Sequence, residues 1–170
     1  MLRVLLTGMS GTGKSTLIQR VAGLGYKAID TDDGFSEWVP LADGVPRYSG
    51  ATGEWLWRED LIRELLATED ADVLFVSGCV RNQSKFYSRF DHVVLLSAPR
   101  DVIVERLRTR GTNPYGKRDE DVAEVVQLQA TVEPLLRKSA SLELVTTESV
   151  DETVNRLLAL IRPLRTPTPP

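Results

Sequence analysis

The chain has 170 residues, with 21 basic and 24 acidic side chains, a net charge of −3, one cysteine and one histidine. This length predicts a single domain, and the hydrophobic content of 42% argues against a disordered or fibrous protein. Cys79 alone cannot form an internal disulfide or a multi-thiolate zinc site, and His92 alone excludes a His-rich metal centre. No apolar run approaches about 18 residues, which predicts a cytoplasmic protein without a membrane span. The mildly acidic charge argues against binding of duplex nucleic acid.

Short β-rich runs alternate with amphipathic stretches along the chain. Strands are predicted at residues 3–7, 27–30, 73–77, 93–97 and 142–146. Helices are predicted at residues 14–22, 54–67, 99–110 and 119–138, and after a capping-box pattern at Ser149 and Glu152. The alternation predicts an α/β three-layer sandwich, in which a five-stranded parallel sheet is covered by helices on both faces. Binding chemistry is then expected at the carboxyl ends of the strands.

The domain is expected to cover residues 1–162, followed by a Pro-rich flexible tail at residues 163–170. Two segments, residues 39–53 and 111–118, lack clear periodicity and are rich in glycine, proline and polar residues. They fit either surface loops or functional loops, because long loops in a compact domain often carry function.

Residues 8–15 match the pattern G-x-x-x-x-G-K-[ST] and lie between a predicted strand and a predicted helix. Backbone N–H groups can wrap a polyphosphate only where glycines permit unusual backbone angles, and the helix that follows points its positive end at the anion. Lys14 is expected to bridge the β- and γ-phosphates, and the Ser15 hydroxyl to ligate Mg²⁺. The predicted phosphate-binding residues are Gly8, Ser10, Gly11, Thr12, Gly13, Lys14, Ser15 and Thr16.

Two common classes of P-loop protein do not fit the rest of the chain. A GTPase needs an N-K-x-D element, and the nearest string, at residues 82–85, reads N-Q-S-K. Motor ATPases need an acidic end to the Walker B strand, whereas the strand at residues 73–77 runs into Gly78 and Cys79 without an acid.

The layout resembles the small phosphotransferases of the nucleoside monophosphate kinase and shikimate kinase type, over roughly residues 2–162. The resemblance is carried by the phosphate loop, by Asp30-Thr31-Asp32 after the second strand, by a glycine that ends the third strand and by an arginine-bearing lid at residues 111–118. It implies that Asp30 acts near Mg²⁺ and that Asp32 holds, and possibly deprotonates, the acceptor hydroxyl.

In kinases of this type, arginines before the lid stack over adenine or clamp the transferring phosphoryl group. Arg106 and Arg110 are four residues apart and share one helix face, so the resemblance gives them this catalytic role. The alternative is a solvated basic helix end that complements the helix dipole, and this alternative suits Arg108 better. Asp33, similarly, fits a helix-capping role better than Asp32 does.

The acceptor is expected to bind within residues 33–67, with Asp32, Trp38, Arg81 and Asn82 as candidate contacts. Arg47, Arg58 and Arg81 are candidates for binding an anionic acceptor. Trp38, Trp55 and Trp57 either stack on an acceptor ring or simply pack in the core. The chain lacks the glycine triplet that helps shikimate kinases hold shikimate and the G-x-P-R pattern of adenylate kinases. A hydroxylated metabolite, a nucleoside and a nucleotide therefore all stay open as acceptors.

The sequence thus predicts an enzyme that moves the γ-phosphoryl group of ATP, with Mg²⁺, to a small hydroxylated or nucleotide acceptor. Two alternatives are a polynucleotide-end kinase and a regulatory nucleotide-binding switch without catalysis. The sequence leaves the oligomeric state open.

Overall fold

The computed structural model describes residues 1–42, 51–111 and 115–161. Its main sheet has five parallel strands in the order β2-β5-β1-β6-β7. These strands are β1 (Leu2–Thr7), β2 (Lys27–Asp30), β5 (Val73–Ser77), β6 (His92–Ser97) and β7 (Leu142–Val145). A separate antiparallel pair is formed by β3 (Ser36–Pro40) and β4 (Gly53–Trp57).

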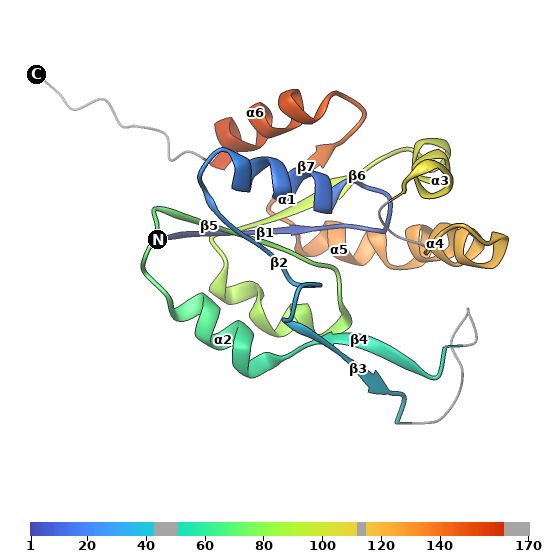
Figure 1. Ribbon diagram of the computed structural model, residues 1–170, viewed down its shortest axis with the longest axis horizontal. Coiled ribbons are helices and arrows are strands. Elements are labelled where there is room, and N and C mark those ends of the chain that lie inside the picture. The colour runs from blue at the N-terminus through green and yellow to red at the C-terminus, as the bar shows by residue number, and fades with distance from the viewer. Residues whose placement is uncertain (43–50, 112–114, 162–170) are drawn as a thin grey trace, which may run out of the picture.

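Helices cover both faces of the main sheet, which confirms the predicted three-layer sandwich. They are α1 (Lys14–Gly23), α2 (Glu59–Ala67), the 3₁₀ helix η1 (Arg81–Arg89), α3 (Arg100–Thr109), α4 (Asp119–Thr131), α5 (Glu133–Ser139) and α6 (Val150–Ile161). Figure 1 shows α1 and α6 on one face of the sheet and α2 on the other, with α3 and α4 beyond the carboxyl ends of the strands.

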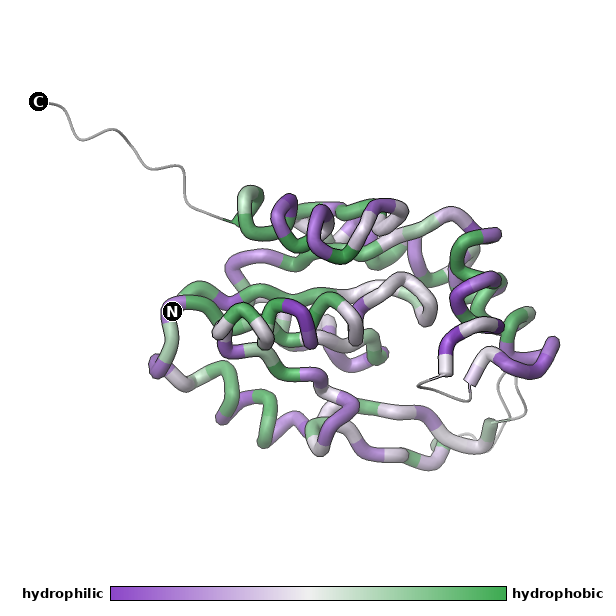
Figure 2. Tube along the Cα trace, turned by 45° about the horizontal axis from the view of Figure 1, so that its top comes forward, coloured by the Kyte–Doolittle hydropathy of each residue, from purple (hydrophilic) through white to green (hydrophobic). Residues whose placement is uncertain are grey.

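The core follows from the alternation of side chains along the strands. In β1, Val4 and Leu6 pack with α1 and α6, whereas Leu5 packs on the opposite face with Ile62 and Leu66 of α2. Val4, Leu5 and Leu6 are therefore fully buried on the two faces of β1, and Figure 2 shows hydrophobic (green) stretches through the middle of the fold.

Two predicted helices differ from the structure. The predicted helix at residues 54–67 is a strand, β4, followed by the shorter helix α2, because Trp55 and Trp57 alternate along a β-ribbon before the helical spacing of Ile62, Leu65 and Leu66 begins. The predicted helix at residues 119–138 is divided into α4 and α5, which meet at Val132. Pro134 stands in the first turn of α5, where its missing N–H is tolerated.

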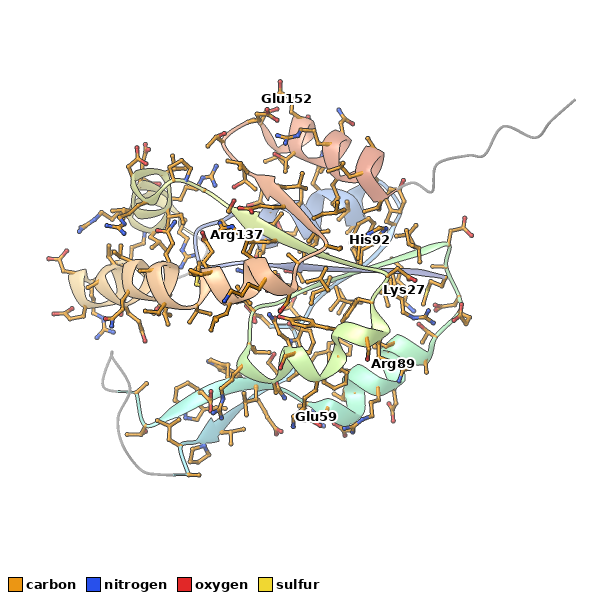
Figure 3. The ribbon with its side chains drawn as sticks, turned by 180° about the vertical axis from the view of Figure 1, so that it is seen from behind. Lys27, Glu59, Arg89, His92, Arg137 and Glu152 are labelled. Carbon is orange, nitrogen blue, oxygen red and sulfur yellow. The ribbon has the colours of Figure 1, made fainter. Side chains whose placement is uncertain are left out.

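Other features match the predictions. Ser149 and Glu152 form the expected capping box, with hydrogen bonds in both directions at the start of α6 (Figure 3). His92 opens β6 and pairs in register with Val4, so it lies toward the amino end of the sheet, away from the phosphate loop.

Within the residues that the structure describes, no helix is both long and apolar enough to cross a membrane. The predicted tail at residues 163–170 lies outside the described residues, as do residues 43–50 of the predicted acceptor segment and residues 112–114 of the predicted lid.

Leu95 and Leu135 offer a matched test of this core, because Leu95 is 0% exposed in β6 and Leu135 is 59% exposed on α5. We expect Leu95→Ala to lower the free energy of unfolding by about 2–5 kcal/mol, since it leaves a cavity. Leu135→Ala should change it by no more than about 0.5 kcal/mol. Urea denaturation of both variants measures the difference, and equal losses would contradict the assigned burial.

Candidate active site

The phosphate loop connects the end of β1 to the start of α1. Gly8 has φ 148°, and a Cβ atom there would lie 2.2 Å from the carbonyl oxygen of Leu96, so only glycine fits. Gly13 precedes α1 in the left-handed conformation, with φ 95°. No side chain caps α1 and its first turn has no acidic residue, so its amino end has the geometry and the charge to receive an anion. Ser15 and Thr16 follow on the exposed first turn.

The loop is held from behind by the end of β7. The hydroxyl of Thr146 donates a hydrogen bond of 2.8 Å to the carbonyl oxygen of Thr12, and both residues are buried. The guanidinium of Arg106 donates to the hydroxyl and the carbonyl oxygen of Thr146 and, at 3.4 Å, to the carbonyl oxygen of Gly11. Arg106 is therefore occupied in bracing the loop against β7.

Lys14 lies across the phosphate loop. Its ammonium donates hydrogen bonds to the carbonyl oxygens of Gly8, at 2.6 Å, and Met9, at 3.1 Å. Burial lowers the pKa of Lys14, with a smaller contribution in the same direction from Arg110, while the negative charges of Asp32 and Asp30 act in the opposite direction. A bound phosphate would add negative charge beside the ammonium and favour its charged form.

The predicted acidic pair lies at the end of β2, close enough to Lys14 for their charges to interact. Asp30 ends the strand and its carboxylate accepts a hydrogen bond of 3.3 Å from the backbone N–H of Asp32. The pKa of Asp32 is raised, first by partial burial and then by the negative charge of Asp30, and Lys14 opposes this shift. The ends of β1 and β2 therefore bring a cation and two carboxylates into one site.

Arg110 lies beside the phosphate loop. Its guanidinium donates hydrogen bonds to the hydroxyl of Ser10, at 3.2 Å, and to the carbonyl oxygen of Tyr115, at 2.6 Å. Its Nε atom is buried without a hydrogen-bond partner in the described part of the chain. The pKa of Arg110 is lowered by this burial. Arg108, in contrast, forms an exposed ion pair with Asp119, in line with its predicted solvated role.

The described residues of the predicted lid, 111 and 115–118, form hydrogen bonds with α3 and α4. Gly116 donates its backbone N–H to the buried carboxylate of Asp121, which also pairs with Arg118. Lys117 donates to the carbonyl oxygens of Arg108 and Arg110 at the end of α3. Lys117 and Arg118 thus hold the base of the lid in this structure.

The candidate acceptor residues occupy different surroundings. The side-chain amide of Asn82 forms two hydrogen bonds with the backbone of Trp57. Its oxygen accepts from the N–H of Trp57 at 3.0 Å, and its nitrogen donates to the carbonyl oxygen of Trp57 at 2.9 Å. Arg81 is exposed and forms an ion pair with Glu54. Trp38 is 47% exposed, on β3. The roles of these residues toward an acceptor stay predictions.

Trp57 packs in the core rather than facing an acceptor. It is buried, and its indole N–H donates to the hydroxyl of Thr31 at 2.9 Å. Thr31 in turn donates to the carbonyl oxygen of Ser77, so it ties the Asp30–Asp32 turn to β5. Gly78 ends β5 as expected, and a Cβ atom there would lie 2.4 Å from the Thr31 hydroxyl.

Sequence reasoning assigned no positioning role to Thr31 or Thr146, and it considered Gln83 only as a possible polar contact for the acceptor. Gln83 is buried under the loop, where its amide contacts the hydroxyls of Thr7 and Tyr87. A single threonine or glutamine carries no local pattern, and the only available signal was the place of Thr31 inside the D-x-D turn.

We expect Asp32→Asn to raise the free energy of unfolding at about pH 7.5, by less than about 1 kcal/mol because solvent screens a partly exposed charge. A carboxyl with a raised pKa in the folded state destabilises the fold when it is ionised, and this penalty vanishes at low pH, where Asp32 is protonated in both states. The gain should therefore shrink toward pH 4. Denaturant melts at both pH values test this, with Asp72→Asn as the control, and a gain that grows on acidification would contradict the raised pKa.

Comparison with known proteins supports the same fold and a kinase activity. A family model described as "AAA domain" matches residues 4–127. The chain is 28% identical over 165 residues to an adenylate kinase isoenzyme 6 homolog of Caenorhabditis elegans, which covers 92% of this chain and 87% of that protein. It is 26% identical over 166 residues to a shikimate kinase of Neisseria gonorrhoeae, which covers 92% of this chain and 94% of that protein.

Solved structures share the fold at lower identity. The shikimate kinase of Bacteroides thetaiotaomicron has a TM-score of 0.64 at 20% identity, covering 94% of this chain and 97% of that one. The shikimate kinase of Acinetobacter baumannii, solved in complex with shikimate, has a TM-score of 0.64 at 18% identity, covering 95% and 93%. The chain therefore belongs to the AAA domain family and is a P-loop small-molecule kinase of the nucleoside monophosphate kinase and shikimate kinase group.

Proposed function

We propose that this kinase transfers the γ-phosphoryl group of Mg-ATP to a hydroxyl group of a small acceptor. The observation that carries the proposal is the position of Asp32, a carboxylate with a raised pKa that lies within electrostatic reach of the phosphate-loop lysine, Lys14. A phosphate binder and a candidate base at one site are what transfer to a hydroxyl requires.

The groups that would bind the triphosphate are already close together in the phosphate loop and at the amino end of α1. The backbone of the loop and the amino end of α1 supply N–H donors, and Lys14 supplies charge. Arg110 adds an Nε–H group that is buried and unsatisfied among the described residues. Such a donor destabilises the protein until it finds an acceptor, and a phosphate oxygen beside Ser10 would serve.

The residues at the site also suit Mg²⁺. Ser15 and Asp30 offer a hydroxyl and a carboxylate oxygen, the hard donors that Mg²⁺ prefers when it is shared with substrate phosphates. When bound, the metal would neutralise phosphate charge in the transition state. Asp30 would hold it while Asp32, two residues later, faces the acceptor.

Asp32 would then act on the acceptor hydroxyl. Its carboxylate accepts the proton as the acceptor oxygen bonds to the γ-phosphorus, and the bond from that phosphorus to the β,γ-bridging oxygen breaks to release ADP. A pKa raised toward neutrality strengthens a carboxylate as a base. Lys14 and Arg110 would stabilise the charge on the transferring group.

The kinetic test compares Asp32→Asn with Asp33→Asn, its exposed neighbour. Each protein is mixed with Mg-ATP and a panel of nucleosides, nucleotides, sugars, hydroxy acids and oligonucleotides, and ADP release and product mass are measured. We expect Asp32→Asn to bind ATP normally but to lower kcat about 100-fold or more, while Asp33→Asn stays within about threefold of the wild type. Lys14→Ala should abolish turnover.

Undiminished transfer by Asp32→Asn would overturn the role of Asp32. If ATP binds but no acceptor accelerates ADP release, the protein is a nucleotide-binding switch rather than a phosphotransferase. Transfer to oligonucleotide ends alone would make it a polynucleotide-end kinase.

Two arginines at the carboxyl end of α3, Arg108 and Arg110, give a second pair of matched variants. We expect Arg110→Ala to lower kcat about 100-fold, because it removes a donor beside the transferring phosphoryl group. Arg108→Ala breaks only an exposed ion pair with Asp119 and should leave kcat within about twofold. Thermal melts identify any loss that comes from unfolding, and equal rates for the two variants would rule out a catalytic role for Arg110.

A further inference from the structure

Trp38 and Trp55 form an exposed aromatic pair on the β3–β4 ribbon. They are direct cross-strand partners, their ring centroids are 5.9 Å apart at an interplanar angle of 72°, and they are 47% and 57% exposed. Large exposed aromatic surface is unfavourable in water unless a ligand or partner covers it. The pair therefore needs a functional explanation.

The ribbon holds this pair in place. A Cβ atom on Gly53 would lie 2.5 Å from Nε1 of Trp38, so the indole of Trp38 rests directly on the Gly53 backbone. Trp55 packs edge-to-face against Trp38. The two rings are fixed before any ligand arrives, which reduces the entropy lost on binding.

The pair lies on the face of the ribbon that turns toward the active site. Side chains two residues apart on a strand share a face, so Trp55 is on the same face as Trp57, and its cross-strand partner Trp38 is too. Trp57 on that face donates a hydrogen bond to Thr31, the residue before Asp32. The exposed indoles thus share a ribbon face with the side chain that contacts the turn carrying the candidate base.

Among the described residues, the charge near the pair disfavours an anionic acceptor. Asp30, Asp32 and Asp33 lie in the turn before the ribbon, whereas Glu37 and Glu54 lie on the ribbon face opposite to the indoles, and residues 30–42 and 51–57 contain no lysine or arginine. Of the arginines that follow, Arg81 is already paired with Glu54. Arg58 continues β4 in an extended conformation and so lies on the face opposite to Trp57. Within the described part of the chain, a phosphate or carboxylate on the acceptor would meet the charge of the Asp30–Asp33 turn without a compensating arginine on the indole face, while Arg47 lies outside the described residues.

We propose that the acceptor is a nucleoside, whose flat base stacks on Trp38 and Trp55 while its sugar hydroxyl reaches Asp32. Aromatic side chains bind bases of any sequence because every base has a flat π-face. The carboxylates suit the hydroxyls of a sugar, which donate hydrogen bonds. This inference rests on the proposed phosphoryl transfer, and it separates this protein from kinases that act on nucleotides or on hydroxy acids.

The test uses cytidine, guanosine and thymidine, their 5′-monophosphates, and shikimate. Adenosine is left out because its base would also compete for the ATP site. We expect at least one nucleoside to be phosphorylated with a kcat/KM at least tenfold above that of its monophosphate and of shikimate. Trp38→Leu and Trp55→Leu should raise KM for that nucleoside about tenfold with kcat within about threefold, and Trp38→Phe should restore most of the affinity. Thermal melts establish that each variant is folded.

The outcomes separate the two proposals. Efficient transfer to a monophosphate or to shikimate would keep the phosphotransferase and overturn the nucleoside assignment, as would leucine variants with an unchanged KM. A second readout is the quenching of tryptophan fluorescence by the same nucleosides without ATP. Quenching that Trp55→Leu weakens, with no transfer to any acceptor, would support the nucleoside site and overturn phosphoryl transfer. Neither quenching nor transfer would overturn both.

Discussion

The close approach of Gly8 to the carbonyl oxygen of Leu96 fixes the point at which the chain leaves the sheet, and the rest of the site depends on it. A side chain at Gly8 would collide with β6, so the backbone must turn there into the loop that precedes Lys14. Because β1 is the central strand, between β5 and β6, this turn opens at the middle of the sheet's carboxyl edge. Thr146 at the end of β7 then fastens the far side of the loop. The phosphate site is thus set by backbone geometry and by strand order.

Three charged groups at this edge are held in unfavourable surroundings. Lys14 is buried and its pKa is lowered, Asp32 has a raised pKa, and Arg110 has a buried Nε–H without a partner in the described chain. Elsewhere among the described residues, charged side chains form ion pairs, as Arg137 does with Glu143. Charged groups with shifted pKa values or unpaired donors that lie close together indicate a functional site. Each of them destabilises the unliganded protein, and a bound ligand would offset that loss.

Features that depend on consecutive residues could be predicted from the sequence. The phosphate loop could be predicted because its glycines, Lys14 and the strand and helix around them are consecutive, and β5 and β6 because they are continuous apolar runs. The β3–β4 ribbon was missed because its two strands are separated by a long segment that contains glycine and proline, and because β4 runs directly into the helical spacing of α2. The bracing role of Thr146 and the contact of Asn82 with the backbone of Trp57 could not be predicted, since each depends on a distant part of the chain.

This contrast explains why the fold and the phosphate site are easier to assign than the acceptor. Phosphates are bound mostly by backbone N–H groups, so any sequence that keeps the turn at Gly8 and the start of α1 keeps that function. Acceptors are recognised by side chains, and here the candidate surface belongs to a ribbon that packs on the domain through Trp57 and Thr31 rather than being part of the main sheet. Its outer residues can change without disturbing the core, because Trp38 and Trp55 are exposed while Trp57 is buried. Relatives at 26–28% identity can therefore share the phosphate chemistry and still differ in the molecule that they phosphorylate.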